Sequence, residues 1–339
     1  NKSLRLFYDE VEVYSSEARW LHPLFEVETF LSQHPYDADK LYLRDKIAGK
    51  AAAFLIVRLG IKRAHIGLVS TGARAVFQRF GVHATFDTEV PAIQCRTEQL
   101  VDAEADPEAV WQMLRRRAGR VTGVDLVIEN LHVFIEGKPI ITNLNLNLGR
   151  GDQAIVKGPN GAGKTTLLKT ILGVLPIQSG GITINNIDIR NRTEIGNKIG
   201  YVSQEKNANR FPILASEVVE IGLTGQKYGR NEVQHRVEIA MKRAGCWHLA
   251  KQSFHELSGG EKQRVSIARC FCQQAQVLLL DEPTSFLDAE AKSDLFELLT
   301  GLSTNEAPTI LMVSHDDEWI ARFNWPVYEL KKGQLCLSS

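Results

Sequence analysis

The amino-acid sequence predicts an α/β protein with two domains. Strand-like and helix-like patterns alternate over residues 1–120, which is typical of a small α/β domain. Further along, an apolar strand leads through a glycine-rich loop into a helix at 154–172, and a buried strand at 277–281 ends in adjacent carboxylates. With 339 residues, the chain is long enough to bury two separate hydrophobic cores.

The first domain contains three expected strands and one expected buried helix in its opening ninety residues. Alternating apolar, aromatic and β-branched residues predict the strands at 4–14, 64–70 and 83–90. The segment at 49–60 is alanine-rich and ends at Gly60, which predicts a buried helix. The alternation of strands with helices favours an α/β layer structure.

Two more helices of this domain have recognisable ends. One begins with Thr71 as the expected N-cap, and Gly81 follows its last turn, where a left-handed glycine is common. The other has Asp106 as its expected N-cap, Pro107 as its first helical residue and a basic end near Arg120, which suits the helix dipole.

The predicted secondary structure changes after the basic segment RRRAGR at 115–120, because a β-rich stretch begins at Val124. We interpret the basic segment as a solvated helix end beside a linker rather than as a nucleic-acid patch. The expected domains are therefore 1–120 and 121–339.

Composition narrows the classes of function. Forty basic residues balance forty acidic ones, so the overall charge gives no indication of nucleic-acid binding. The five cysteines are scattered without the spacing of disulfides or zinc ligands, which suits a reducing compartment. The longest apolar run, at 51–57, is far shorter than the roughly 20 residues that cross a bilayer. The N-terminal residues, which do not begin with Met, show no signal-peptide pattern.

The segment AIVKGPNGAGKTT at 154–166 fits the phosphate-binding pattern G-x-x-x-x-G-K-[ST] between a strand and a helix. Glycines let the backbone N–H groups face a phosphate, the lysine neutralises β- and γ-phosphate oxygens, and the following hydroxyl ligates Mg²⁺. The residues expected around the phosphates are Gly158, Pro159, Asn160, Gly161, Ala162, Gly163, Lys164, Thr165 and Thr166.

A second piece of the site follows the strand VLLLDEP at 277–283. Two adjacent carboxylates at the end of a buried strand are poorly explained by packing, because their desolvation is costly. Asp281 is the expected Mg²⁺ ligand, directly or through water. Glu282 is the expected base that orients the attacking water. The two segments together predict a nucleotide-hydrolysis site.

The order of motifs resembles the ATP-binding cassette ATPases over residues 124–339. GPNGAGKTT is followed by YVSQ, ELSGGEKQR, VLLLDEP, SFLD and VSHDD, in the order and with the spacing of that family. The resemblance implies a RecA-like core, an antiparallel β subdomain and a helical subdomain at about 205–275. It also implies ATP and Mg²⁺ as cofactors.

The same resemblance implies roles for residues at matching positions. Gln204 corresponds to the glutamine that contacts Mg²⁺, Asp288 to the D-loop aspartate, and His315 to the switch histidine near the γ-phosphate. The signature loop, which would act on the nucleotide of a partner cassette, comprises Leu257, Ser258, Gly259, Gly260 and Glu261.

Two positions depart from the family pattern. The aromatic residue that usually stacks on adenine would fall at Ile135, and Phe134 lies beside it on the opposite face of a strand. Either Phe134 serves through a local irregularity, or adenine stacking is weak. In the D-loop, bulky Phe286 stands where a small residue is usual.

The resemblance suggests two functions of different kinds. In the first, the chain powers import of a metal ion or metal chelate, since residues 205–223 look similar to cassettes of such systems. It would pair with a second copy and bind a separate permease at the cytoplasmic face of the membrane. In the second, it is a cassette ATPase that acts on nucleic acid or ribosomes. Such proteins commonly carry two cassettes or a coiled-coil insert, and this chain shows neither, so no nucleic acid is expected.

Residues 1–102 resemble a bacterial domain of unknown function with a cytidine-deaminase-like α/β/α fold. The resemblance rests on LRDKIAGKAAAFLIV and VPAIQCRTEQLV, where Cys95 precedes Glu98 and Gln99. Zinc deamination needs H-x-E and a pair of cysteines, which this segment lacks. We expect a regulatory or sensing domain with an unidentified ligand, in which Cys95 is either a reactive thiol or structural.

Overall fold

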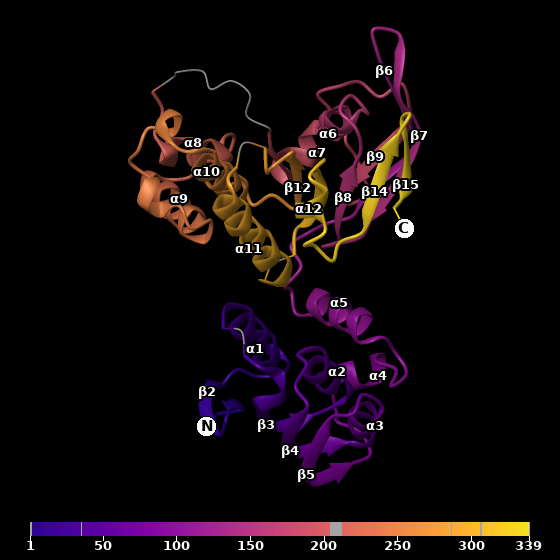
Figure 1. The fold of residues 1–339 in the computed structure, drawn as a ribbon, viewed down its shortest axis with the longest axis vertical. Helices are drawn as coiled ribbons and strands as arrows, with labels where there is room; N and C mark the ends of the chain where they lie inside the picture. The colour runs from indigo at the N-terminus through magenta and orange to yellow at the C-terminus, as the bar shows by residue number, and fades with distance from the viewer. Residues whose placement is uncertain (1, 35, 204–211, 286, 306, 339) are drawn as a thin grey trace. The chain divides into compact units, whose positions relative to one another are not determined.

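The computed structural model describes residues 2–34, 36–203, 212–285, 287–305 and 307–338. It divides the chain into two compact units, residues 1–121 and 122–339 (Figure 1). Each unit combines helices with β-sheet, which confirms the α/β class. Among the described residues, no helix has the length and apolar character needed to cross a membrane.

The first unit contains one five-stranded sheet of order β2-β1-β3-β4-β5, in which β3, β4 and β5 are parallel. Its strands are β1 (Leu4–Tyr8), β2 (Val11–Ser16), β3 (Leu41–Ala48), β4 (Arg63–Ser70) and β5 (His83–Val90). Its helices are α1 (His22–Gln33), η1 (Ala38–Lys40), α2 (Lys50–Arg58), α3 (Thr71–Arg79), α4 (Arg96–Leu100) and α5 (Pro107–Arg117).

Two sequence-based expectations for this unit were wrong in detail. The single strand expected at 4–14 is a hairpin, because Asp9 and Glu10 both have positive φ, 47° and 69°, and reverse the chain. The N-cap of α3 is Ser70, whose Oγ accepts a hydrogen bond from the Ala73 N–H at 3.0 Å. The expected cap of α5 is confirmed, since the Asp106 carboxylate accepts from the Ala109 N–H at 2.9 Å.

The core of the first unit lies between one face of the sheet and its helices. Leu4 and Leu6 of β1 are buried there, and so is every residue of α2 from Ala51 to Ile56. On the other face, Arg5 and Arg44 lie opposite each other on β1 and β3 and are exposed. Burial on one side therefore explains the alternation along β1.

The second unit is built around a six-stranded sheet of order β11-β12-β13-β8-β14-β15, parallel except for β15. Its strands are β8 (Gln153–Lys157), β11 (Ile199–Val202), β12 (Val277–Asp281), β13 (Thr309–Val313), β14 (Val327–Lys331) and β15 (Gln334–Leu337). Because β8, β12 and β13 are parallel neighbours, the segments that follow them meet at one edge of the sheet.

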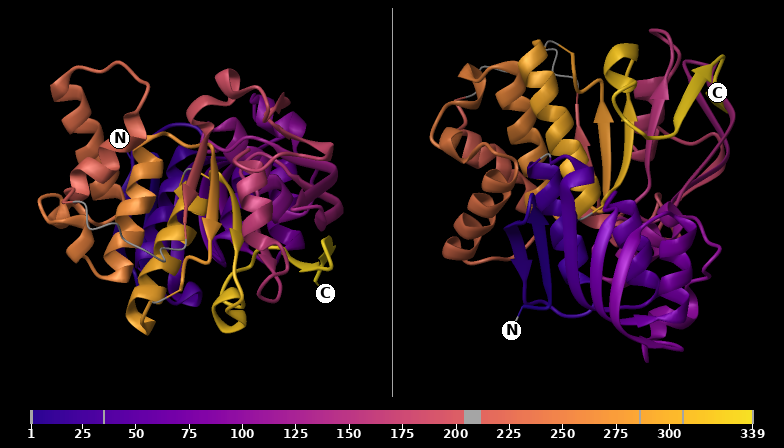
Figure 2. Two further views of the ribbon diagram at one scale, coloured as in Figure 1. Left: turned by 90° about the horizontal axis from the view of Figure 1, so that it is seen from above. Right: turned by 60° about the horizontal axis from the view of Figure 1, so that its bottom comes forward.

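An antiparallel sheet and a group of helices flank this core on opposite sides (Figures 1 and 2). The antiparallel sheet has the order β10-β9-β6-β7, with β6 (Leu126–Ile135), β7 (Lys138–Leu148), β9 (Ser179–Ile184) and β10 (Ile187–Asp188). The helical group comprises α8 (Ala215–Glu220), η3 (Ile221–Leu223), α9 (Arg230–Arg243), η4 (Trp247–Leu249), η5 (Phe254–Glu256) and α10 (Gly259–Cys272). The remaining helices are α6 (Lys164–Ile171), α7 (Arg192–Ile195), η2 (Gly196–Lys198), α11 (Ala289–Asn305) and α12 (Asp317–Ile320).

Candidate functional site

The glycine-rich loop connects the end of β8 to the start of α6. Gly163 has φ 101°, a backbone conformation that side-chain-bearing residues rarely adopt, and it is the N-cap of α6 without any side-chain cap. A Cβ atom on Gly158 would lie 2.6 Å from the Leu330 carbonyl oxygen. The loop therefore needs glycine at both places, and no side chain occupies the N-terminus of α6 as its cap. Such an end is suited to bind an anion.

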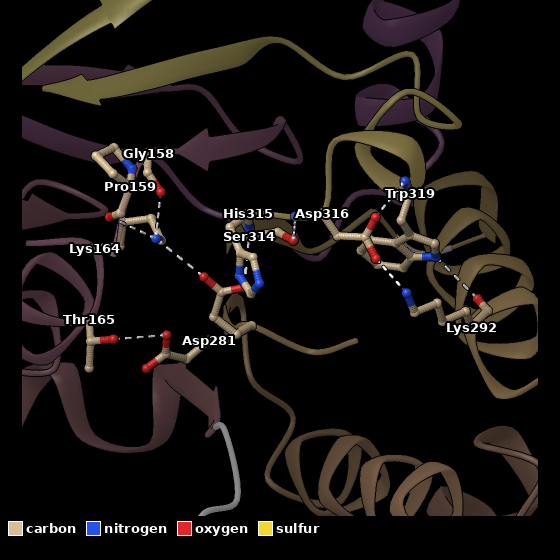
Figure 3. Close-up of polar contacts among 11 residues, drawn as sticks. Gly158, Pro159, Lys164, Thr165, Asp281, Lys292, Ser314, His315, Asp316 and Trp319 are labelled. Carbon is tan, nitrogen blue, oxygen red and sulfur yellow. Dashed lines mark hydrogen bonds and ion pairs between the residues drawn. The ribbon is translucent and has the colours of Figure 1, made fainter. Parts of the chain in front are cut away.

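Lys164 folds back over this loop (Figure 3). Its Nζ donates to the carbonyl oxygens of Gly158 at 2.7 Å and Pro159 at 3.3 Å, and it lies 3.3 Å from Glu282 Oε1. The side chains of Lys164 and Glu282 are almost fully buried. The lysine charge is thus held by neighbouring oxygens in the position where a nucleotide phosphate would be neutralised.

Glu282 occupies a strained position at the end of β12. Its φ is 49°, which is unusual for a residue with a side chain, and its N–H is fixed by the Val313 carbonyl at 3.0 Å. Its Oε2 lies 2.7 Å from His315 Nδ1 and accepts from the His315 N–H at 3.2 Å. The structure therefore brings the expected base, the expected switch histidine and Lys164 together.

Both carboxylate oxygens of Asp281 accept hydrogen bonds. Oδ1 accepts from Thr165 Oγ1 at 3.1 Å, and Oδ2 accepts from the Tyr201 hydroxyl at 2.9 Å. Asp281 is buried, and within the described ranges no lysine or arginine forms an ion pair with it. A hydroxyl beside a buried carboxylate without a cation is a donor set that fits Mg²⁺. The sequence analysis included Tyr201 in the YVSQ segment but assigned it no role.

A cavity of about 480 Å³ joins Lys164 and Thr165 to Glu282 and His315. Its lining residues are Ile140, Asn160, Gly161, Gly163, Lys164, Thr165, Thr166, Glu282 and His315. A neighbouring cavity of about 750 Å³ extends along the loop beside Pro139, Ile140 and Lys332. Phe134 and Ile135 are exposed near the end of β6 and line neither cavity, so their contact with adenine stays a prediction. Ile140, which the sequence analysis missed, lines both.

The signature loop lies at the N-terminus of α10. Ser258 is the N-cap, and its N–H donates to Glu261 Oε2 at 2.8 Å, while the Glu261 N–H donates to Ser258 Oγ at 3.4 Å. Hydrogen bonds from the Ser258 backbone and side chain lower the pKa of Glu261. Leu257 is buried, whereas Ser258 and Gly259 are exposed. This helix end is therefore exposed but already capped by its own residues.

A separate cavity of about 170 Å³ links the signature loop to the D-loop. It is lined by Ser258, Gly260, Glu261 and Asp288, together with neighbouring residues of α10 and α11. Asp288 caps α11, because its Oδ1 accepts from the Ala291 N–H at 2.8 Å. The structure therefore places Ser258 with Asp288 and not in the cavity of Lys164. Gln204 and Phe286 lie outside the described residues.

Three hydrogen bonds around Asp316 hold the loop that carries His315 against α11 and α12 (Figure 3). Asp316 accepts from the Trp319 N–H at 3.1 Å, which caps α12, and from Lys292 Nζ of α11 at 2.5 Å. The indole N–H of Trp319 donates back to the Lys292 carbonyl at 3.2 Å. These contacts, which the sequence analysis missed because Lys292 lies in no motif, tie the helix that follows the D-loop to the residue after His315.

Cys95, the candidate residue of the first unit, is half-buried at the N-cap of α4. Burial raises the pKa of its thiol, but hydrogen bonds with Thr97, Trp20 and Glu98 together outweigh that effect, so the pKa is lowered overall. The Sγ lies 2.9 Å from Thr97 Oγ1. The buried Glu98 carboxylate accepts from the Lys50 N–H at 2.7 Å and thereby caps α2. Gln99 is exposed.

Comparisons with known proteins support this picture. A family model described as ABC transporter matches residues 141–285, and a model described as a domain of unknown function (DUF1893) matches residues 1–117. The zinc uptake system ATP-binding protein ZurA of Listeria monocytogenes is 36% identical over 56% of this chain and 76% of its own length.

Two solved structures share the fold of the second unit. The structure of cbiO1 from Clostridium perfringens, part of the ABC transporter complex cbiONQ, has a TM-score of 0.58 and 31% identity over 62% of this chain and 86% of its own. A dimeric structure of the ATP-binding cassette MJ0796 bound to ADP and Pi has a TM-score of 0.55 and 29% identity, over 63% of this chain and 98% of its own. With the phosphate loop, the acidic strand and the switch histidine gathered at one cavity, these matches show that the chain belongs to the ABC transporter family of ATP-binding proteins.

Proposed function

We propose that this chain hydrolyses Mg-ATP to power the import of a metal ion or metal chelate. The observation that carries the hydrolytic part is the cavity that combines Lys164 and Thr165 of the phosphate loop with Glu282 and His315. Residues from three parallel strand ends converge there, and each supplies a group that phosphoryl transfer requires.

Each group has a distinct part in the proposed reaction. Lys164 exchanges its carbonyl partners and Glu282 for the β- and γ-phosphates, which frees the Glu282 carboxylate to orient a water molecule in line with the γ-phosphate. His315 donates toward the γ-phosphate as charge develops there. Thr165 and Asp281 would hold Mg²⁺, which neutralises phosphate charge when bound. Gln204 is proposed as a further ligand of that ion.

A second copy of the chain is proposed to complete each site. Ser258 lies in a different cavity from Lys164, so the signature loop does not complete the site of its own chain in this structure. In a head-to-tail pair, the exposed N-terminus of α10 would face the γ-phosphate held by the other chain. The dimeric structure of the similar cassette MJ0796 supports the pairing of two cassettes.

The transport role rests on the relatives. ZurA is described as part of a zinc uptake system, and cbiO1 as part of a transporter complex. By analogy, this chain would bind a separate permease at the cytoplasmic face of the membrane. A metal ion or chelate is the proposed cargo. The alternative, a cassette that acts on nucleic acid or ribosomes, has no comparable support in these relatives.

The first unit is proposed to regulate the ATPase by sensing a small ligand. Its match to a domain of unknown function leaves the chemistry open. The deaminase-like fold also remains a proposal, supported by the mixed sheet with helices packed against it. The Cys95 environment, with its lowered thiol pKa, is compatible with a reactive thiol, which is the second candidate for this unit.

The substitution Glu282→Gln tests the hydrolytic proposal. It preserves the size of the side chain and one acceptor oxygen but removes the base, so we expect ATP binding to persist while turnover falls by at least about 100-fold. The ATP-bound chain should then accumulate as a dimer, which size-exclusion chromatography with and without ATP measures. Hydrolysis near the wild-type rate would remove Glu282 from this role.

Copurification tests the transport proposal. The tagged chain, extracted in mild detergent, should bring down a polytopic membrane protein, and metal uptake into cells should fall with Glu282→Gln. Recovery of ribosomes or nucleic acid in place of a membrane protein would support the alternative.

A further inference from the structure

Tyr201 lies beside the proposed divalent-ion site, at the start of the YVSQ segment, where the sequence assigned a role only to Gln204. β11 runs parallel to β12, and Tyr201 is in register with Leu279. Asp281 is two residues beyond Leu279 and therefore points to the same face of the sheet. Tyr201 packs against the buried cluster on that face, which includes Leu167 and Leu168 of α6. The register thus places the phenol diagonally behind the Asp281 carboxylate.

Hydrogen bonds hold both the side chain and the backbone of Tyr201. The hydroxyl donates to Asp281 Oδ2 at 2.9 Å, because an ionised carboxylate can only accept. The Tyr201 carbonyl accepts from Arg269 Nη2 of α10 at 2.5 Å, so the backbone of the tyrosine is also held.

The second oxygen of Asp281 faces the phosphate loop. Oδ1 accepts from Thr165 Oγ1 at 3.1 Å. With that bond alone, the carboxylate could turn about its last torsion, which has only broad preferences. The Tyr201 bond to the other oxygen fixes the plane of the carboxylate. Partners of this kind around metal ligands commonly set ligand orientation and metal affinity.

We propose that Tyr201 is a positioning residue that holds the Asp281 carboxylate in the orientation needed to bind a divalent cation beside Thr165. This inference rests on the proposed Mg²⁺ site and extends it to a residue that the sequence motifs gave no role. The competing explanation is that Tyr201 only fills space in the core. Phenylalanine would fill the same space without the hydroxyl, so Tyr201→Phe separates the two explanations.

The experiment uses the full chain and a fluorescent, non-hydrolysable ATP analogue. Affinity for the analogue is measured in EDTA and during a Mg²⁺ titration. For Tyr201→Phe we expect the Mg²⁺ concentration at half-maximal binding to rise about tenfold, with affinity in EDTA unchanged. Tyr328→Phe is the matched control, because Tyr328 of β14 is half-buried against the same cluster. It should titrate as the wild type does.

Three results would overturn the inference, and they differ in what they imply for the proposed Mg²⁺ site. A Tyr201→Phe titration equal to that of the wild type removes the positioning role and leaves the Mg²⁺ site intact. An equal loss of affinity with and without Mg²⁺ assigns Tyr201 to packing. If Mg²⁺ leaves the affinity of the wild type unchanged, the metal site itself fails and the inference fails with it. Thermal unfolding of both variants verifies that they fold.

Discussion

Two glycine-rich loops in the second unit each lead into a helix, but the N-termini of the two helices are capped differently. Gly163 begins α6 without a side-chain cap, whereas Ser258 begins α10 and exchanges two hydrogen bonds with Glu261. The first helix N-terminus opens into a cavity with Lys164 and Glu282. The second opens into a smaller cavity with Asp288.

The difference in capping indicates that the first loop binds a phosphate itself, whereas the second loop completes a site on another chain. The N-terminus of α6 has no capping side chain and has a buried cation beside it, so it can take up a highly charged phosphate. The N-terminus of α10 is stabilised by its capping box, which satisfies the N–H groups of Ser258 and Glu261. It is therefore suited to meet a nucleotide that another chain already holds.

The largest effect on ATP binding is expected from removing the positive charge of Lys164 in the first loop. Lys164→Ala should weaken ATP binding by about 100-fold or more, because Glu282 and the phosphates would both lose their buried positive partner. Lys262→Ala, in the first turns of α10, is the matched control and should leave ATP binding unchanged. Fluorescence titration with an ATP analogue measures both. An equal loss in the two variants would contradict the distinction between the loops.

A complementation experiment tests whether the second loop acts on the other chain. Ser258→Glu places a carboxylate where a phosphate would approach, so it should abolish hydrolysis but keep ATP binding at low protein concentration. Mixed with Lys164→Ala, it should regain at most about a quarter of the wild-type rate, since half of the pairs are mixed and each has one complete site. Two inactive variants that stay inactive after mixing would argue against a head-to-tail pair.

A smaller effect, on KM for ATP, is expected from changing Ile140 beside the first loop. Ile140→Ala removes apolar surface from both cavities beside the loop and should raise KM for ATP about threefold. Phe134→Ala should change KM less, because Phe134 lines neither cavity. Steady-state hydrolysis at varied ATP concentrations separates them. A larger effect of Phe134→Ala would restore the adenine-stacking prediction made from the sequence.

The sequence was most informative where a motif fixes a local backbone. The loop around Gly163 and the acid pair at 281–282 were identified because phosphate binding restricts both residue type and spacing. The contacts of Tyr201 and Lys292 were missed, since they join residues 80 and 24 positions apart in the sequence. The hairpin at Asp9 was missed because its turn lacks glycine and asparagine.

The smallest effect on hydrolysis is expected from deleting the first unit. The compact units meet at 121–122, and the core of the second begins at Val124 within its own cluster. A chain of residues 122–339 should therefore fold and hydrolyse ATP within about twofold of the full chain, since no cavity residue is lost. Circular dichroism, thermal unfolding and an ATPase assay measure this. A truncated chain that does not fold would show that the units are not independent. Because no ligand of the first unit is added, a well-folded truncated chain with a much higher or lower rate would show that residues 1–121 change ATP hydrolysis even without their ligand.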